Sequence, residues 1–399
     1  MQEILILPDV RASTVGTRSL EERLKSIHNN IYANEGIKQR SRVMDEVVKV
    51  LFARLHAERA GVEVASAATT YSARELFRDA VQREAAGLFE PSDKIQLSDE
   101  ALEFAMAQLG PERLRAQDPK GAAFQTVLGP TLRGELGQFF TPDPVKALLV
   151  GLTSPTKGSL VGDPASGSAG LLLEASQVVP DVKIRAVEID ASLARLARMN
   201  LYLSGIDEPD VVRADALLPL GILREVTGGR VAAGIFDIIV TNPPFGSKGK
   251  ISDPMVLAGL AKASAGKKAV APEILFIERV VQLLRDGGRA GIVLPLGILS
   301  NASAAYIRRY LRREGRIYAT VALPPETFRP TGNSVNSALV FFEKRGPSQT
   351  AYPVFRAISS SVGYDHRGRI VSDGADAPAV LQAWDQFRAR YGTESPWLS

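Results

Sequence analysis

The sequence contains no cysteine among its 399 residues and only three histidines, His28, His56 and His366. The absence of thiols excludes disulfide bonds and thiolate metal sites. Because the three histidines are scattered along the chain, a histidine metal centre is not expected, and we assign no metal.

The sequence also lacks long hydrophobic runs and a strong charge imbalance. No apolar stretch approaches the ~20 residues of a membrane span. Residues 1–7 have no basic region and too short an apolar core for a signal peptide, so we expect a cytoplasmic protein without a membrane partner. The net charge of +4, with 45% hydrophobic residues, is ordinary for a globular chain and permits an anionic partner.

The first third of the chain has apolar residues at helical spacing, which predicts a helical N-terminal domain over residues 1–134. Ser98-Asp99-Glu100 is typical of a helix start, and Gly110-Pro111 of a helix stop. This region has no catalytic cluster, so an accessory or docking role is favoured. A second domain is expected over 135–345, followed by a less regular tail over 346–399 that is a candidate for subunit docking.

Strands and helices alternate from Gly158 onward, which predicts an α/β fold with a doubly wound, mainly parallel sheet. The expected strands are 159–162, 184–187, 211–212, 235–240, 290–294, 317–323 and 338–342. The expected helices are 169–178, 191–204, 273–284 and 304–313, with a short one near 381–390 in the tail.

A stiff loop, Asn242-Pro243-Pro244-Phe245, directly follows the expected strand 235–240. Two prolines cannot continue the hydrogen-bond ladder, so the loop lies at the carboxyl end of its strand, where open α/β sheets bind ligands. It offers an amide side chain, carbonyls and an aromatic ring. These groups suit an exocyclic amino group on a flat ring.

Acidic residues are expected at the ends of three successive strands. Asp163 opens a small-residue loop that runs to Gly170, and Glu188 and Asp215 follow the next two strands. The loop is neither a dinucleotide fingerprint nor a Walker motif. Taken singly, each acidic residue is as well explained as a solvated helix cap. Together they indicate a nucleoside pocket without a phosphate, which suits S-adenosylmethionine better than NAD.

Two basic segments each have two interpretations. Residues 246–271 form a long, lysine-containing connection, which predicts either a solvated mobile loop or a contact with a nucleic-acid backbone. Residues 308–313 carry four arginines, and a solvated helix face is favoured there over a phosphate contact.

Several short motifs follow one another in a specific order. They are Gly137-Gln138-Phe139-Phe140-Thr141-Pro142, Asp163 to Gly170, Glu188, Asp215, Asn242 to Phe245, Pro272 to Phe276, Gly287-Gly288-Arg289, Leu323 to Phe328 and Val362 to Asp365. Over residues 120–370 the chain resembles the modification (M) subunits of type I restriction–modification systems, which are adenine-N6 DNA methyltransferases. The sequence departs from that family at Ser166, where cysteine or alanine is commoner, and at Ala169, which replaces a glycine.

The resemblance implies a Rossmann-like S-adenosylmethionine-dependent methyltransferase sheet and a set of site residues. The Asn242 side chain and the Pro243 carbonyl would hold the adenine amino group, with Pro244 fixing the loop and Phe245 stacking on a flipped base. Glu188 would bind the cofactor ribose and Asp215 its adenine. The methionine end would be held by Gln138, Phe139, Phe140, Thr141, Pro142 and Asp143, and its amino acid portion would be bordered by Asp163, Ser166, Gly167, Ser168, Ala169 and Gly170.

The resemblance also implies partners. The expected substrate is double-stranded DNA, and because no separate recognition domain is evident, a DNA specificity subunit would choose the target. A restriction (nuclease) subunit and a second M subunit are further candidate partners. Two rival interpretations remain. One is an RNA or protein amine methyltransferase, and the other is a catalytically silent methylase-like subunit that binds nucleic acid.

Overall fold

The protein forms two compact units, described from a computed structural model. One unit comprises Met1–Glu135 with Met199–Asp207, and the other comprises Leu136–Arg198 with Glu208–Ser399. The structure describes residues 18–61, 70–83, 89–110, 113–114, 141–245, 249–329, 335–345, 351–364 and 370–391. The domain boundaries predicted after residues 134 and 345 stay predictions.

The first unit contains the predicted N-terminal helices. Ser19 caps the first helix, since its hydroxyl accepts a hydrogen bond from the Glu22 amide while the Glu22 carboxylate accepts one from the Ser19 amide. Apolar residues such as Leu24, Ile31 and Leu102 are fully buried in this unit. Its helices are α1 (Leu20–Asn34), α2 (Arg40–Ala60), α3 (Thr70–Arg83) and α4 (Asp99–Leu109).

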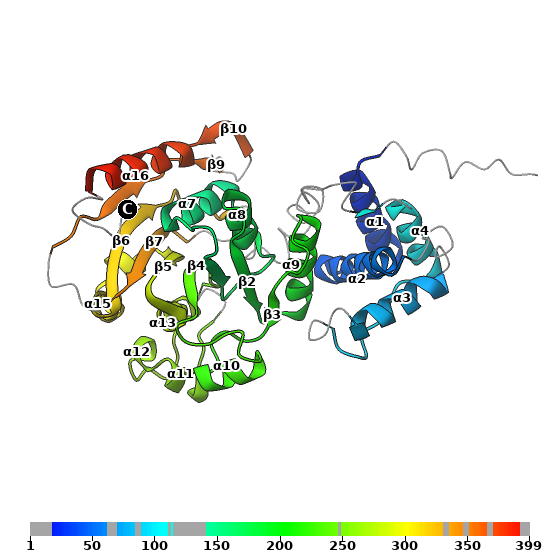
Figure 1. Ribbon diagram of the computed structural model, residues 1–399, viewed down its shortest axis with the longest axis horizontal. Helices are drawn as coiled ribbons and strands as arrows, with labels where there is room; N and C mark the ends of the chain where they lie inside the picture. The colour runs from blue at the N-terminus through cyan, green and yellow to red at the C-terminus, as the bar shows by residue number, and fades with distance from the viewer. Residues whose placement is uncertain are drawn as a thin grey trace, which may run out of the picture. The chain divides into compact units, whose positions relative to one another are not determined.

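The second unit is built on an eight-stranded sheet with the order β3-β2-β1-β4-β5-β7-β6-β8 (Figure 1). All neighbouring strands are parallel except β7, which is antiparallel to both β5 and β6. This topology confirms the predicted doubly wound α/β fold. The strands are β1 (Leu160–Asp163), β2 (Lys183–Glu188), β3 (Val211–Arg213), β4 (Phe236–Thr241), β5 (Leu284–Pro295), β6 (Gly315–Ala322), β7 (Ser337–Lys344) and β8 (Phe355–Ile358).

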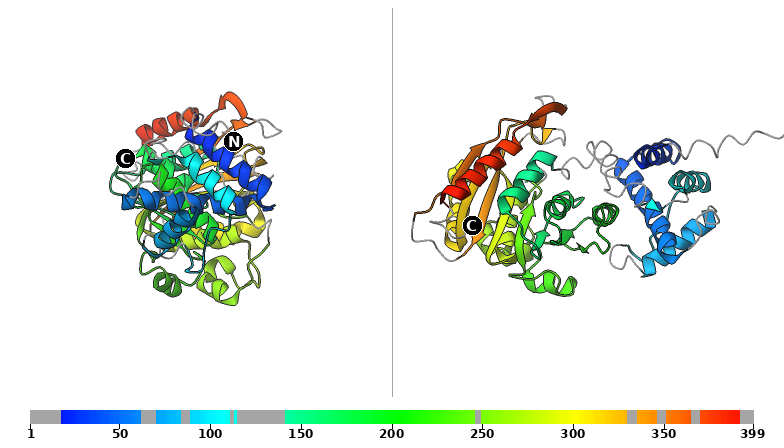
Figure 2. Two further views of the ribbon diagram at one scale, coloured as in Figure 1. Left: turned by 90° about the vertical axis from the view of Figure 1, so that its right-hand side faces the viewer. Right: turned by 45° about the horizontal axis from the view of Figure 1, so that its top comes forward.

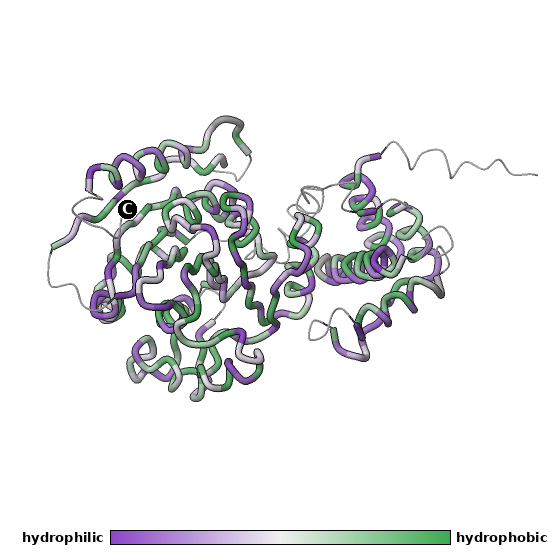
Figure 3. Tube along the Cα trace, in the orientation of Figure 1, coloured by the Kyte–Doolittle hydropathy of each residue, from purple (hydrophilic) through white to green (hydrophobic). Residues whose placement is uncertain are grey.

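Helices cover both faces of the sheet, and β5 shows how its residues are divided between them. Ala290 and Ile292 belong to a core cluster that includes apolar residues of α13 (Pro272–Leu283) and α15 (Ala305–Glu314). Gly291 faces the other way, because a Cβ added there would lie 3.0 Å from Leu149 Cδ2 of α7 (Asp143–Thr153). Figure 3 shows the hydrophobic residues that run along these central strands. Further helices are α8 (Gly170–Val178), α9 (Ala191–Leu203), α10 (Leu220–Val226) and α14 (Gly297–Ser300), with a 3₁₀ turn, η3 (Ala302–Ala304).

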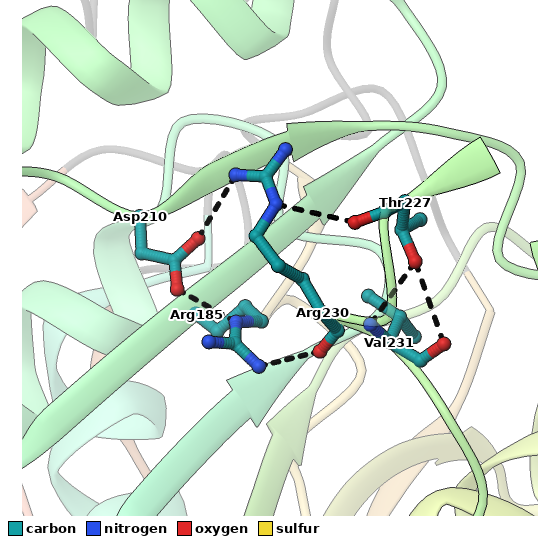
Figure 4. A network of polar contacts seen from close by, with 5 residues as sticks. All are labelled: Arg185, Asp210, Thr227, Arg230 and Val231. Atoms are coloured by element: carbon teal, nitrogen blue, oxygen red, sulfur yellow. Dashed lines mark hydrogen bonds and ion pairs between the residues drawn. The ribbon is translucent and has the colours of Figure 1, made fainter. Parts of the chain in front are cut away.

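A polar network fixes the connection that leads from α10 into β4 (Figure 4). Arg185 of β2 donates to the Asp210 carboxylate at 2.6 Å, and its guanidinium also donates to the Arg230 carbonyl. The Arg230 side chain reaches Asp210 as well, at 3.4 Å. The Thr227 hydroxyl accepts from the Val231 amide at 3.1 Å. These contacts fix the connection at the end of the sheet opposite to the carboxyl ends of the strands.

The chain after residue 346 adds regular structure where the sequence indicated little. β8 pairs in parallel with β6, and α16 (Ala377–Tyr391) packs beside α7 (Figure 2). Trp384 is 3% exposed, with its ring 5.4 Å from that of Phe355 and 5.8 Å from that of Tyr318. Two short strands, β9 (Val362–Tyr364) and β10 (Ile370–Ala375), form a separate antiparallel pair.

The long connection after the Asn-Pro-Pro-Phe loop is also folded over its described residues 249–271. It contains α11 (Pro254–Gly259) and α12 (Ala261–Ser264). An isolated β-bridge joins Ile251 to Val270 and closes the segment on itself. In the described ranges of the chain, no helix is long and apolar enough to cross a membrane.

Candidate functional site

The site lies at the carboxyl ends of β1 and β4, which are neighbouring parallel strands. Asp163 ends β1 and Thr241 ends β4. The Thr241 hydroxyl donates to Asp163 Oδ1 at 2.7 Å, and both side chains are buried. Because Asn242 follows Thr241 directly, this bond joins the loop after β1 to the Asn-Pro-Pro-Phe loop.

The small-residue loop after β1 is held against β2 at two points. The Ser166 amide donates to the Val187 carbonyl at 3.0 Å, and the Gly167 amide donates to Glu188 Oε2 at 2.8 Å. Gly167 has a φ of 52° and Ala169 a φ of 61°, so both adopt the left-handed conformation. This conformation costs a residue with a Cβ about 1–2 kcal/mol. A glycine at position 169 would adopt it without that cost, and α8 begins directly after Ala169.

The two buried carboxyl groups have unusual proton affinities. Burial raises the pKa of Asp163 to about 7, against the hydrogen bonds that it accepts from Thr241 and the Ala165 amide. The nearby charge of Glu188 raises that pKa further. Burial also raises the pKa of Glu188 to about 6, although its carboxylate accepts bonds from the amides of Asp190 and Gly167. Both groups therefore change their charge near neutral pH and favour a cationic or hydroxyl-bearing ligand.

A pocket of about 220 Å³ opens beside these carboxyl groups. Its polar groups come from Glu188, Asp215 and Asn242, and Ile189 presents an apolar side chain that is 63% exposed. A flat apolar ring with polar edges fits such a wall. The pocket is lined by Pro164, Ala165, Glu188, Ile189, Ala214, Asp215, Ala216, Leu217, Asn242, Pro244, Ile251, Pro272 and Phe276.

The wall at Asp215 is supported from behind by a buried arginine. Asp215 Oδ1 accepts from the Leu217 amide at 2.8 Å, which turns the chain after β3. Arg279 of α13 is fully buried and donates to the Leu218 carbonyl at 2.6 Å and the Leu217 carbonyl at 3.3 Å. Burial lowers the pKa of Arg279 to about 10, which the charges of Glu278 and Asp215 oppose. Arg279 therefore fixes the loop that carries Asp215.

Asn242 is oriented by the segment before α7. Its side-chain nitrogen donates to the Thr141 hydroxyl at 3.2 Å. Within the described part of the chain, the Asn242 side-chain oxygen has no hydrogen-bond partner, so it can accept one from a ligand. Asp143 lies on the same segment, but its side chain is 89% exposed and pairs with Lys146 at 2.5 Å. The structure thus places Thr141 at the site and directs Asp143 to solvent.

Phe245 lies against a second motif from far along the chain. Its side chain is 5% exposed, and its ring meets that of Phe328 edge to face, with 6.4 Å between ring centroids. Phe328 follows Thr327, whose hydroxyl donates to the Pro324 carbonyl at 2.7 Å. The structure therefore brings the predicted Leu323 to Phe328 motif to the Asn-Pro-Pro-Phe loop, and it leaves little of the Phe245 ring open for stacking.

The structure places the predicted site residues in several different positions. Glu188, Asp215, Asn242 and Pro244 line the pocket. Pro243 is buried in the same loop, and Pro142 is the N-terminal cap of α7. Asp163 and the residues Ser166, Gly167, Ser168, Ala169 and Gly170 form the strand end, loop and helix start beside Glu188. Gln138, Phe139 and Phe140 lie outside the described residues.

Sequence reasoning missed three residues at the site: Thr241, Ile189 and Arg279. Thr241 is a polar residue at the end of an apolar strand, and Arg279 is a charged residue within an apolar helix. Both breaks in the apolar pattern could have marked these residues as candidates from the sequence. Ile189 stands directly after Glu188 and could have been assigned by adjacency. Over the ranges that the structure describes, no group of three His, Asp or Glu residues could hold a metal ion.

Residues 123–371 match the family model described as N-6 DNA Methylase. The chain is 30% identical over 236 residues to the type I restriction enzyme EcoEI methylase subunit of Escherichia coli, covering 55% of this chain and 45% of that protein. It is 27% identical over 282 residues to the type I restriction enzyme StySJI methylase subunit of Salmonella typhimurium, and the match covers 66% of this chain and 50% of that protein. The chain thus spans about half the length of these curated relatives.

Solved structures share the fold. A chain from a type I R-M system superposes with a TM-score of 0.68 at 22% identity, covering 96% of this chain and 85% of that one. The methyltransferase subunit of a type I restriction-modification system from Streptococcus thermophilus gives a TM-score of 0.64 at 19% identity, covering 93% and 92%. At these identities the agreement establishes the architecture.

Proposed function

The chain belongs to the N-6 DNA methylase family, and we propose that it transfers a methyl group from S-adenosylmethionine to the N6 amine of adenine in DNA. The observation that carries this proposal is the Asn242 side chain. Thr141 holds its nitrogen, while its oxygen is open at the wall of a pocket that also contains Glu188 and Asp215. An exocyclic amine needs such an acceptor.

The residues of the pocket fit S-adenosylmethionine. Glu188 would accept hydrogen bonds from the ribose hydroxyls, and Ile189 and Asp215 would contact the adenine ring and its edge. The Asp163 carboxylate would attract the ammonium group, and the buried Ser166 hydroxyl, which has no partner among described residues, would serve the amino acid portion. Gln138 to Pro142 would border the methionine end, where the Thr141 hydroxyl accepts a hydrogen bond from Asn242. When bound, the cofactor supplies an electrophilic methyl group.

The protein's contribution to the reaction is mainly positioning. The amino nitrogen of adenine is a weak nucleophile, because its lone pair is delocalised into the ring. The Asn242 side-chain oxygen and the Pro243 carbonyl would each accept a hydrogen bond from the amino group. These two hydrogen bonds would localise the lone pair on the nitrogen. Pro244 keeps the loop rigid. The target base must be flipped from the duplex, at a cost of a few kcal/mol, to reach these groups. Phe245 would contact it only through the small part of its ring that is exposed.

We further propose that the chain acts as the modification subunit of a type I restriction–modification complex. A DNA specificity subunit would select the target, and a restriction subunit and a second copy of this chain would complete the assembly. The support is the similarity to type I methylase subunits along 55–66% of the chain.

In the direct test, the purified chain and its specificity subunit are incubated with duplex DNA and with S-adenosylmethionine that carries a tritiated methyl group. We expect tritium in DNA as N6-methyladenine. Tritium in RNA or protein alone would contradict the DNA substrate. Cofactor binding without any transfer would instead favour the silent, nucleic-acid-binding interpretation.

A further inference from the structure

The segment 249–271 is part of the pocket wall and carries exposed lysines. The Ile251 amide donates to the Val270 carbonyl at 2.8 Å, and the Val270 amide donates back at 2.9 Å. Ile251 lines the pocket. Lys250 and Lys268 lie next to this bridge, and both are exposed. The bridge therefore places the backbone of two exposed lysines beside the wall of the proposed cofactor site.

Contacts with α15 extend this cluster of positive charges. The Tyr306 hydroxyl donates to the Ala263 carbonyl of α12 at 3.0 Å. The Lys267 ammonium lies 4.1 Å from the centroid of the Tyr306 ring, a cation–π contact. Arg309 and Arg312 are exposed and lie on the helix face that begins at Tyr306, at successive steps of three residues. Figure 1 shows α12 and α15 on the same side of the sheet as α13.

Nearby carboxylates are engaged elsewhere. Asp253, the one acidic residue between 249 and 271, caps α11 by accepting hydrogen bonds from the Met255 and Val256 amides. Glu278 is 4% exposed and accepts a bond from the Ala263 amide at 2.6 Å. Glu278 is therefore withdrawn from the surface, and Asp253 is exposed but held at the start of α11. The resulting cationic surface consists of Lys250, Lys262, Lys267, Lys268, Arg309 and Arg312.

We propose that this cationic surface binds the phosphate backbone of double-stranded DNA beside the target adenine. The proposal rests on the proposed function and names where the substrate is held. S-adenosylmethionine has one carboxylate but a net positive charge, so a surface of six cationic side chains suits a polyanion better than this cofactor. Exposed lysine and arginine side chains bind phosphates without reading sequence, which suits a subunit whose target is chosen by another chain.

The test compares two double variants of the full-length chain. Lys250→Gln/Lys268→Gln removes two charges beside the bridge. Lys157→Gln/Lys183→Gln removes two exposed charges at the opposite, amino-terminal edge of the sheet. Binding to a fluorescent duplex of about 30 base pairs is measured by anisotropy from about 50 to about 300 mM salt, and cofactor binding by calorimetry. Binding through phosphate contacts weakens strongly over this range of salt concentration, so the range allows the number of such contacts to be compared.

We expect Lys250→Gln/Lys268→Gln to weaken duplex binding on the order of tenfold in about 50 mM salt. The slope of log K against log salt should fall by about 0.9 for each phosphate that the variant no longer neutralises. The control variant should bind like the unmodified chain, and both variants should keep cofactor affinity. Equally weakened binding by the two variants, no duplex binding by the unmodified chain in low salt, or tighter binding of single-stranded RNA would each overturn the proposal.

These results separate the surface from the catalytic proposal. If the lysine variant weakens duplex binding but no methyl group reaches DNA, the surface stands and the proposed function fails. If DNA is methylated and the lysine variant binds DNA normally, the function stands and the surface is wrong.

Discussion

The Thr241 hydroxyl donates a hydrogen bond of 2.7 Å to the buried Asp163 carboxylate, and it thereby ties the end of β4 to the end of β1. Thr241 directly precedes the loop that carries Asn242. Asp163 begins the loop that leads to α8. A change at this bond is therefore expected to reach both the proposed cofactor site and the proposed base site.

Replacing Thr241 with valine keeps the shape of the side chain and removes the donor. A hydrogen bond to a charged group contributes about 1.5–3 kcal/mol, so Thr241→Val should lower the free energy of unfolding by about that amount at about pH 8. The effect should be smaller at about pH 6, where Asp163 is largely protonated. Urea unfolding at both pH values measures this. Thr241→Ser keeps the hydroxyl and should retain most of the stability, and a Thr241→Val variant as stable as the original would refute the role of the bond.

The raised pKa values of Asp163 and Glu188 predict a pH dependence of stability. Their folded values, about 7 and about 6, exceed their unfolded values of 3.8 and 4.5. Between about pH 4 and pH 7 the folded chain therefore binds more protons than the unfolded chain, and the free energy of unfolding should fall as the pH rises through this window. Asp163→Asn should flatten that slope in denaturant titrations without ligand. An unchanged slope in the variant would contradict the assignment.

The left-handed conformation of Ala169 predicts a stabilising substitution. Glycine adopts a φ of 61° without the steric cost that alanine bears, so Ala169→Gly should raise the free energy of unfolding by about 0.5–1 kcal/mol. The matched control is Ala175→Gly in the interior of α8, which should lower stability by about 1 kcal/mol. Thermal unfolding distinguishes them, and lower stability in both variants would contradict the strain at Ala169.

Much of the second unit could be predicted from the sequence. Strands such as β4 are short apolar runs between turn residues, and their alternation with helices specified a doubly wound sheet. The position of Asn242 at the carboxyl end of β4 followed from the two prolines. The helix predicted at 273–284 agrees with α13 (Pro272–Leu283) to within one residue at each end. The strand after it was predicted at 290–294, but β5 already begins at Leu284, and Gly287, with a φ of 75°, lies inside it.

Other features could not be predicted because they depend on interactions between distant residues. The antiparallel strand β7 inserts between β5 and β6, and nothing local to β7 specifies those neighbours. The burial of Phe245 depends on Phe328, which lies 83 positions later in the sequence. Residues 249–271 are held by contacts with distant residues, such as the hydrogen bond that the Tyr306 hydroxyl donates to the Ala263 carbonyl.

The aromatic cluster under α16 predicts that the end of the chain stabilises the sheet. Trp384 packs on Tyr318 and Phe355, and deleting such a buried ring costs about 3–5 kcal/mol. Trp384→Ala should lower the denaturant midpoint of the second unit accordingly. Gln386→Ala, on the exposed side of the same helix, should leave it unchanged. If the two variants unfold alike, α16 does not contribute to the stability of the sheet.

The most direct measurement is methyl transfer by Asn242→Ala, made with its specificity subunit, duplex DNA and labelled S-adenosylmethionine. Removing the acceptor that localises the amine lone pair should slow formation of N6-methyladenine by about 100-fold or more, while the cofactor dissociation constant stays close to that of the original chain. Asn34→Ala, an exposed change on α1, should leave both quantities unchanged. Transfer by Asn242→Ala at the original rate would contradict the proposed role of this residue and with it the account of the site.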